Sequence, residues 1–208
     1  MLRAMKSGLD AACGKIYNLI IAACFPYLAP SLRIPSHLTP RERLALMTLA
    51  RQERVQVIVE IGSYLGASAA AFAAGAKFDS VIYCIDTWNN DEMTDEQRDT
   101  FSDFLVNTRR FSSKIVPVRG RSTDRQITNK IRDCAKSVDL LFIDADHSYQ
   151  GVLADWKAYR PMLSANAIIA VHDIGWAEGV QRVVEEEIRP LIGEECQLPN
   201  LWWGRLAK

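Results

Sequence analysis

Acidic and imidazole side chains follow two apolar segments in the second half of the chain. Asp144, Asp146 and His147 come just after the run "DLLFI", and His172 and Asp173 close the run "AIIAVHD". Carboxylates and imidazoles bind divalent metal ions, and an imidazole, with an ordinary pKa of about 6.5, can also act as a general base. A structural role is the alternative, because Asp144 or Asp146 could simply cap the helix predicted to follow.

The elements that must position these side chains alternate from about residue 55 onward. Short β-branched runs separated by longer helical patterns are typical of a parallel sheet with helices on its faces, and near-continuous apolar runs suit strands buried on both faces. Parallel strands joined by right-handed crossovers end on one rim, where the acids are expected to converge. The predicted strands are 55–61, 80–86, 114–118, 138–144 and 167–173, and the predicted helices are about 66–75, 91–111, 123–135, 149–162 and 177–192.

Two further patterns complete the predicted architecture. The segment "CQLPNLWWGRLAK" predicts an antiparallel hairpin that turns at Pro199 and Asn200, and Thr39 and Pro40 predict the start of an amphipathic helix. The expected fold is therefore α/β: a Rossmann-like, doubly wound, mostly parallel seven-stranded sheet with an antiparallel C-terminal hairpin. Residues 1–54 are expected to form a helical segment that packs on the ligand-binding domain, residues 55–208, or covers its substrate mouth.

A glycine-containing turn follows the first predicted strand. In "VEIGSYLGAS" the strand ends at Glu60, turns through Gly62 and enters a helix near Gly66, so backbone could approach a ligand at the amino end of that helix. The glycine spacing differs from the G-x-G-x-x-G dinucleotide fingerprint, which makes pyrophosphate a less natural ligand. A tight strand-to-helix turn without a ligand is the alternative.

The ends of the second and third strands suggest nucleoside contacts. Asp86 closes the second strand, where a carboxylate could accept both hydroxyls of a ribose. Trp88 could then cover an adenine face or belong to the core. After the third strand, "RGRS" offers Gly120 for close approach and Ser122 for hydrogen bonds to a base edge.

Together these motifs resemble the class I S-adenosylmethionine-dependent methyltransferases, most closely the small bacterial sugar and natural-product O-methyltransferases. The resemblance runs from about Val55 to Ile188 and is most specific in "DLLFIDADHSYQGVLADWKAYRPMLSANAIIAVHDI". It departs from the family pattern at Tyr64, which occupies a usual glycine position. The resemblance implies S-adenosylmethionine as cofactor, held by Glu60, Gly62, Ser63, Gly66, Ser68, Asp86, Thr87, Trp88, Gly120, Arg121, Ser122 and Asp144.

The resemblance also implies catalytic roles at the fourth and fifth strand ends. Methyl transfer to a hydroxyl is an in-line displacement by oxygen on a sulfonium methyl group, so the oxygen must be aligned and activated. His147 matches the general base, and Asp144 and Asp173 match ligands of a divalent metal such as magnesium or manganese. His172 stands where an acidic residue is more usual; either it is not a ligand or the ion is softer than magnesium, because imidazole suits manganese, iron or zinc.

Composition narrows the class of partner. The 208 residues include 25 basic and 25 acidic ones, and no Lys/Arg block is interleaved with aromatics, so a small-molecule or sugar acceptor is expected and no nucleic acid. Five scattered cysteines without C-x-x-C spacing favour reduced thiols and a cytoplasmic location. The sequence leaves open whether the protein forms a homo-oligomer.

The N-terminal apolar stretch "IYNLIIAACFPYLAP" is too short to span a bilayer, so no stable membrane span is expected. Its "IAAC" resembles a lipoprotein cleavage box, but Tyr17 and Asn18 interrupt the apolar core and Pro26 follows closely. A helix packed on the domain, or over its substrate mouth, is the preferred interpretation. The segment 89–110 is expected to be a solvated helix and a second candidate lid.

The leading hypothesis is an S-adenosylmethionine-dependent O-methyltransferase that acts on a hydroxyl of a small molecule or sugar. Three alternatives stay open. An NAD(P)-dependent oxidoreductase would share the sheet, a metal-dependent hydrolase would use Asp144, His172 and Asp173, and an exported binding domain would require cleavage at Cys24.

Overall fold

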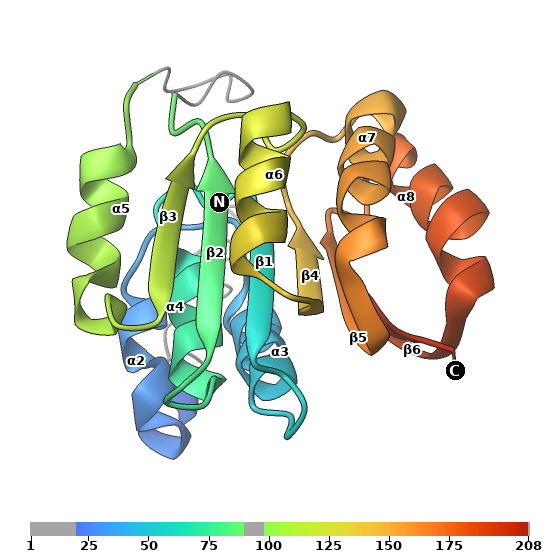
Figure 1. Cartoon of the computed structure of the whole chain (residues 1–208). Coiled ribbons are helices and arrows are strands. Elements are labelled where there is room, and N and C mark those ends of the chain that lie inside the picture. The colour runs from blue at the N-terminus through green and yellow to red at the C-terminus, as the bar shows by residue number, and fades with distance from the viewer. Residues whose placement is uncertain (1–19, 90–97, 208) are drawn as a thin grey trace, which may run out of the picture.

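The computed structural model describes residues 20–89 and 98–207. Its described part contains one seven-stranded sheet with the strand order β3-β2-β1-β4-β5-β7-β6 (Figure 1). The strands are β1 (Val57–Ile61), β2 (Val81–Asp86), β3 (Ile115–Arg119), β4 (Val138–Ile143), β5 (Leu163–His172), β6 (Ile192–Gln197) and β7 (Leu201–Leu206).

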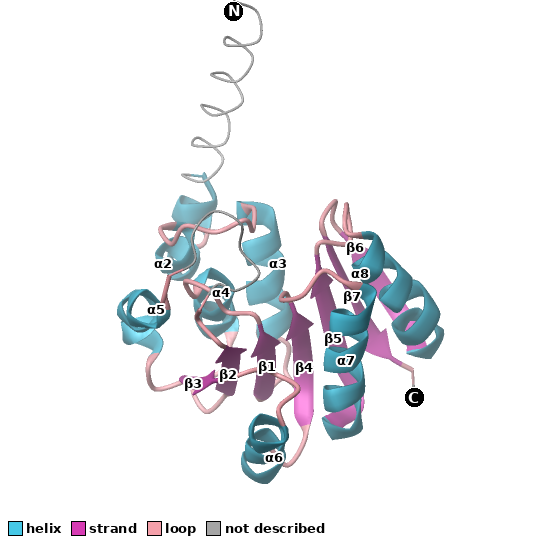
Figure 2. Cartoon of the chain, turned by 90° about the horizontal axis from the view of Figure 1, so that it is seen from above, coloured by secondary structure: helices cyan, strands magenta, loops and turns pink. Residues whose placement is uncertain are grey.

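The helices lie on the two faces of this sheet (Figure 2). One face is covered by α2 (Ala29–Leu32), α3 (Pro40–Ala50), α4 (Ala67–Gly75) and α5 (Phe101–Thr108), and the other by α6 (Arg125–Cys134), α7 (Tyr149–Tyr159) and α8 (Glu178–Val183). Short 3-10 turns cover Pro26–Leu28, Arg109–Phe111, Arg160–Met162 and Arg189–Leu191, and a π-helical turn covers Val184–Ile188. Within the described residues, no helix has both the length and the apolar character needed to cross a bilayer.

The sheet is parallel from β3 through β5 and antiparallel where β7 pairs with β5 and β6. This confirms the predicted doubly wound fold with its C-terminal hairpin. The chain builds β1, β2 and β3 outward in one direction and then returns to place β4 on the other side of β1. Ligands of such sheets bind at the carboxyl ends of the strands beside this change of direction.

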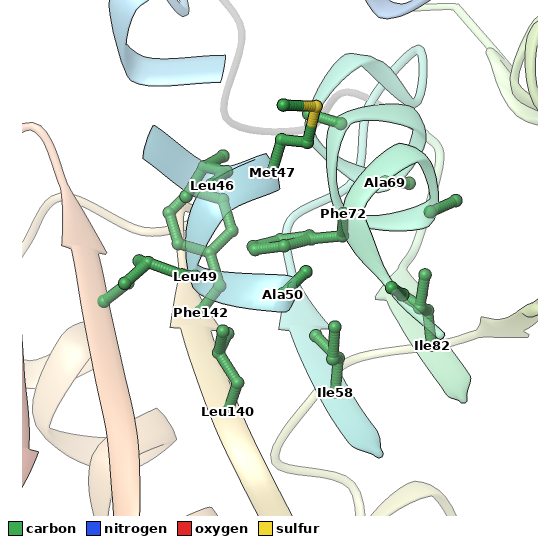
Figure 3. Close-up of a cluster of buried hydrophobic side chains, with 14 of the residues drawn as sticks. Leu46, Met47, Leu49, Ala50, Ile58, Ala69, Phe72, Ile82, Leu140 and Phe142 are labelled. Carbon is green, nitrogen blue, oxygen red and sulfur yellow. The ribbon is translucent and has the colours of Figure 1, made fainter. Parts of the chain in front are cut away.

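Apolar side chains fill both faces of the central strands because residues one apart along a strand point to opposite sides. Ile58 and Leu140 join the cluster under α3 and α4 (Figure 3), whereas Val59 and Leu141 join the cluster under α7 and α8. Each fully buried aliphatic side chain of this kind stabilises the fold by about 1.5–3 kcal/mol. The two clusters therefore hold β1 and β4, the strands nearest the site, from both sides.

The start of α3 agrees with its sequence signal. The Thr39 hydroxyl accepts a hydrogen bond from the Glu42 N–H at 3.3 Å, and the Thr39 N–H donates to the Glu42 carboxylate at 2.7 Å, which is a capping box with Pro40 in the first turn. Most predicted boundaries hold to within two or three residues, and three elements differ more. Strand β5 begins at Leu163 rather than 167, the segment predicted as one helix over 177–192 is split by the π-helical and 3-10 turns, and, in the described part of the predicted helix 91–111, residues 98–100 precede α5 without helical structure.

The predicted lid, 89–110, is only partly described, since residues 90–97 lie outside the described residues. In the described part, α5 packs on the turn before α4: Phe104 is buried and the Asn107 amide donates to the Leu65 carbonyl at 3.0 Å. None of the residues 98–110 lines the cavity described below. Of the N-terminal segment, residues 20–54 are described, and α2 and α3 pack against α4.

Candidate active site

The carboxyl ends of β1, β2, β3, β4 and β5 open into one cavity of about 700 Å³, a volume within the range of ligand pockets. Most of the predicted site residues line it: Gly62, Ser63, Ser68, Asp86, Thr87, Gly120, Arg121, Ser122, Asp144, His147, His172 and Asp173. The rim of the sheet thus brings together residues from five strand ends. Glu60, Gly66 and Trp88 are not among the lining residues.

The turn after β1 is held by Asp86. Its Oδ2 accepts hydrogen bonds from the backbone N–H groups of Ser63 at 2.9 Å and Tyr64 at 2.8 Å, and its Oδ1 accepts one from Trp88 N–H at 2.7 Å. A carboxylate has about four lone-pair positions, so roughly one remains for a ligand. The Asp86 carboxylate could accept both hydroxyls of a ribose only if one of these backbone bonds gave way.

Gly62 has a different reason to be glycine than the one expected. Its φ is +85°, and a Cβ there would lie 2.0 Å from the backbone oxygen of Asp144. The missing side chain therefore lets the turn after β1 pack against the chain leaving β4. Gly66 at the start of α4 also has a positive φ, and its missing side chain makes room for Thr108 of α5, so a packing role accounts for this glycine; the ligand contact at Gly66 stays a prediction.

Trp88 belongs to the core, the second of the two alternatives that the sequence left open. Its side chain is fully buried between the rings of Phe101 and Phe104, each with a centroid distance of 4.8 Å. Its indole N–H donates to the Tyr64 carbonyl at 2.9 Å. Trp88 thus fixes α5 and the turn after β1 to each other, behind the cavity.

Glu60 lies beneath the cavity rather than in it. Its side chain is 0% exposed, one carboxylate oxygen accepts a hydrogen bond from the Ser63 hydroxyl at 2.6 Å, and the other oxygen has no hydrogen-bond partner among the described residues. Burial raises the pKa of Glu60 to about 7. Ser63 and Ser68, which line the cavity, lie beside it. A buried, under-satisfied carboxylate at this depth fits a cationic ligand above it.

The other end of the cavity carries a cluster of acids and histidines. Asp144 Oδ1 lies 3.1 Å from His172 Nδ1, Asp173 Oδ1 lies 3.2 Å from the same nitrogen, and Asp173 Oδ2 lies 2.9 Å from His147 Nε2. Burial disfavours the charged imidazole of His172, but the charge and hydrogen bond of Asp144 and the bond to Asp173 outweigh it and raise its pKa to about 12. The hydrogen bond to Asp173 likewise raises the pKa of His147.

Asp173 connects most of this cluster. Burial alone would raise its pKa, but hydrogen bonds from His147, His172 and Asn200 hold the pKa of this carboxyl well below its ordinary range. The Trp176 indole N–H also donates to it at 2.8 Å, and the Asn200 amide donates at 2.9 Å. Asp173 is therefore a fixed anion that orients His147 at the cavity wall.

The candidate metal ligands do converge. One ligand atom from each of Asp144, His172 and Asp173 lies within 4.8 Å of the others. Behind His172, the Glu42 carboxylate lies 3.8 Å from Nε2, as outer carboxylates often do behind a metal-bound imidazole. This mixed nitrogen and oxygen set fits manganese, iron or zinc better than magnesium. A proton on His172 Nδ1 satisfies the same two carboxylates.

Asp146 follows the structural alternative instead. Its Oδ1 accepts the Ser148 N–H at 2.6 Å, and the Ser148 hydroxyl accepts the Gly151 N–H at 3.1 Å as the N-cap of α7. Asp146 thus shapes the turn between β4 and α7, whereas Asp144 faces His172 in the cavity.

Sequence reasoning missed several lining residues that reach the cavity from elsewhere in the chain. Residues 35–38 approach from the loop before α3, where the buried Arg43 side chain donates to the carbonyls of Ile34 at 3.0 Å and Leu38 at 3.1 Å. Asn200 arrives from the β6–β7 turn, and Asp155 lies on α7. Trp176 follows Asp173 by three residues. This short spacing was the one feature of the sequence that could have predicted Trp176 as a lining residue.

The sequence matches a family of known proteins and one bacterial relative. Residues 59–174, more than half of the chain, match the methyltransferase domain family. An uncharacterised protein of Sinorhizobium fredii is 30% identical over 173 residues, and the match covers 76% of this chain but 18% of that protein. The chain thus spans less than a fifth of that relative's length.

Solved structures share the fold at low sequence identity. An O-methyltransferase from Bacillus cereus in complex with S-adenosylhomocysteine has a TM-score of 0.64 at 15% identity, covering 95% of this chain and 91% of that one. A TDP-rhamnose 3'-O-methyltransferase of calicheamicin biosynthesis has a TM-score of 0.62 at 16% identity, covering 83% and 82%. At these identities, the likenesses show a shared fold.

Proposed function

Since this chain belongs to the methyltransferase domain family, as its motifs predicted, we propose that it transfers a methyl group from S-adenosylmethionine to a hydroxyl of a small molecule or sugar. The observation that carries the proposal is a single cavity with two chemically different ends. One end has the Gly62 turn, Asp86 and the loop 120–123. The other has the His147–Asp173 pair.

The first end suits the cofactor. The positive charge of its amino-acid part would lie above Glu60, whose unpartnered carboxylate oxygen lacks a donor. The lone-pair position left on Asp86 suits one ribose hydroxyl, and Gly120 and Ser122 line the space for the base. The bound cofactor would supply an electrophilic methyl group on a sulfonium.

At the second end, the acceptor hydroxyl attacks that methyl carbon in line with the breaking carbon–sulfur bond. The oxygen–carbon bond forms, the sulfur keeps the electron pair of the broken bond, and the hydroxyl proton passes to Nδ1 of His147. The other ring nitrogen, Nε2, keeps its own proton and donates it to Asp173 at 2.9 Å, which orients the ring and fixes its tautomer. The products are the methyl ether and S-adenosylhomocysteine.

We also propose that Asp144, His172 and Asp173 hold a divalent metal ion. When bound, the ion would lower the pKa of the acceptor hydroxyl. Glu42 would orient His172 from behind, since it lies 3.8 Å from the distal ring nitrogen. The mutual distances of 3.1 and 3.2 Å from His172 Nδ1 to the two carboxylates support a shared cation there.

The acceptor end suits a hydroxylated ring. Trp176 is 62% exposed, and its ring lies 4.9 Å from that of His147, with the indole N–H held by Asp173. An immobilised, exposed indole offers a flat apolar face, and Asn200 and the exposed His37 offer polar partners on the same cavity wall. The similarity to an enzyme that acts on TDP-rhamnose agrees with a sugar acceptor.

The rival functions lack comparable support. The methyltransferase family match disfavours an oxidoreductase or a hydrolase built on the same rim. We also propose a cytoplasmic location, where the described free thiols, Cys24, Cys84, Cys134 and Cys196, would stay reduced.

Ligand binding and turnover test the proposal. The purified protein should show a thermal shift with S-adenosylhomocysteine and none with NAD or NADP. His147→Ala should reduce methyl transfer to a hydroxylated acceptor by roughly 10²–10⁴-fold while S-adenosylhomocysteine affinity, measured by calorimetry, stays nearly unchanged. A shift with NAD alone, or full turnover by the variant, would reject the assigned chemistry. Elemental analysis of the purified protein and activity after chelation and re-addition of manganese or magnesium test the metal site separately.

A further inference from the structure

One wall of the cofactor end comes from α7. Its lining residues are Gly151, Ala154 and Asp155. The first two are the smallest side chains available, so they leave a flat strip of helix beside the loop 120–123. Asp155 follows them with a carboxylate that is only 3% exposed. We call the space between these α7 residues and the loop 120–123 the slot. It is flat and mostly apolar, and its one anionic group can accept a hydrogen bond from a ligand.

Asp155 is tied to the loop after β3. Its Oδ1 accepts a hydrogen bond from the Ser122 hydroxyl at 2.5 Å, and Tyr159, one turn further along α7, donates from its hydroxyl to the Ser122 carbonyl at 2.9 Å. Ser122 is therefore clamped by two residues of one helix. The relative position of the loop and the helix, and so the width of the slot, is fixed by these bonds.

The other carboxylate oxygen of Asp155 is available. Among the described residues no hydrogen bond reaches its Oδ2, although burial of this carboxyl is deep enough to raise its pKa to about 6. The group is thus mainly ionised at neutral pH with a single hydrogen bond from the protein. Buried carboxylates are normally fully hydrogen-bonded, so a donor from outside the chain would complete this one.

Backbone donors lie beside it. The N–H groups of Ser122 and Thr123 precede the N-cap of α6, Asp124, and neither donates to another described residue. The slot thus presents one anionic acceptor next to free N–H donors. The edge of adenine carries the complementary pattern, since its 6-amino group donates and the neighbouring ring nitrogen N1 accepts.

We infer that Asp155 recognises the 6-amino group of the cofactor's adenine through Oδ2, and so selects an adenine nucleoside over one that carries an oxygen at this position. The inference rests on the proposed function, because it assumes that the nucleoside end of the cofactor occupies the slot. A 6-oxo base exchanges the donor and acceptor positions of this edge: its carbonyl oxygen would face the carboxylate, and its N1–H would face the backbone N–H groups. Sites built around a buried polar partner reject such analogues strongly.

Calorimetry with two ligands tests this assignment. S-adenosylhomocysteine and S-inosylhomocysteine differ only at one edge of the purine, where the second has an oxygen in place of the 6-amino group and a hydrogen on N1. The wild-type protein should bind the adenine ligand roughly 10- to 100-fold more tightly, as a hydrogen bond to a charged group implies. Equal binding of the two ligands by the wild-type protein would overturn the inference without any variant.

Two substitutions separate recognition from mere support of the loop. Asp155→Asn should narrow or reverse the preference, because an amide can donate to the 6-oxygen, whereas Ser122→Ala should keep it. If Asp155→Asn lowered the affinity for both ligands by the same factor, Asp155 would only position Ser122 and the inference would fail. Should Asp155→Asn not fold, the wild-type comparison and Ser122→Ala still decide. Absence of any S-adenosylhomocysteine binding would overturn the proposed function and this inference together.

Discussion

Replacing the buried Glu60 by glutamine should stabilise the ligand-free protein at neutral and alkaline pH. The pKa of this carboxyl is raised by burial from an ordinary 4.5 to about 7. A group whose pKa is higher in the folded state binds protons more tightly there, so its ionisation opposes folding. The opposition is absent below pH 4.5, grows between 4.5 and 7, and is complete above 7.

The magnitude follows from that gap. At ~1.4 kcal/mol per pH unit, the difference between 4.5 and about 7 corresponds to roughly 3 kcal/mol of unfolding free energy lost by the wild-type protein at pH 8. Glutamine keeps the shape and can still accept the Ser63 hydroxyl, but it carries no charge. For a chain of this size, 3 kcal/mol corresponds to a rise in melting temperature of about 6–12 °C.

Urea unfolding of ligand-free protein at pH 5, 6, 7 and 8 measures this directly. The advantage of Glu60→Gln over wild type should be small at pH 5 and largest at pH 8. Glu194→Gln, an exposed change on β6, is the matched control and should follow the wild-type curve. Parallel pH dependences for wild type and Glu60→Gln would refute the argument that Glu60 is held in an unfavourable charged state.

The same substitution, Glu60→Gln, should weaken binding of the cofactor. Because the Glu60 carboxylate is buried directly beneath the end proposed for the cationic amino-acid part of the ligand, Glu60→Gln removes a charge–charge attraction and should lower S-adenosylhomocysteine affinity by roughly 10-fold. Greater stability combined with weaker binding distinguishes this residue from one that only supports the fold. Unchanged affinity in calorimetry would remove Glu60 from the binding site.

Asp86→Ala removes the acceptor of backbone N–H groups that hold the turn after β1, so calorimetry should show S-adenosylhomocysteine affinity reduced by at least ~10-fold; unaltered affinity would contradict this. Trp176→Ala should raise the KM of the acceptor about 10-fold in steady-state kinetics while cofactor affinity stays constant, and a change only in cofactor affinity would count against it. Gly75→Ala should cost about 1–3 kcal/mol in urea unfolding, because its Cβ would lie 1.9 Å from the Met47 carbonyl oxygen, whereas Gly193→Ala meets only ordinary contacts and should be nearly neutral.

The sheet was predictable because its strands are buried on both faces and therefore carry uninterrupted apolar runs. The early start of β5 was not, since "LSAN" is polar and its extension depends on pairing of Leu163 with Val138. Trp88 shows the same limit at the site. An indole after a strand end suits a ligand or a core equally well, and the partners that bury it, Phe101 and Phe104, come from the next helix.

The strand-end rule succeeded for the acids of β4 and β5 because topology alone brings them to one rim. It could not find contributions from distant segments. His172 meets Glu42 only because α3 packs beside β5's end, and Asn200 reaches the rim only through an antiparallel strand. Asp155 lies inside a predicted helix, where a lone acid is usually on the solvent-exposed face. The spacing of apolar residues in that helix did not predict its burial.

The place of β7 between β5 and β6 has a consequence for how the protein matures on the ribosome. Until residues 201–206 emerge, β5 has an open backbone edge where β7 later pairs, and the amide of Asn200 is missing from Asp173. Nascent chains that have not yet formed β7 would expose the unpaired edge of β5, which can pair with strands of other chains, and an incomplete rim. Formation of the rim therefore waits for β7, which pairs with both β5 and β6.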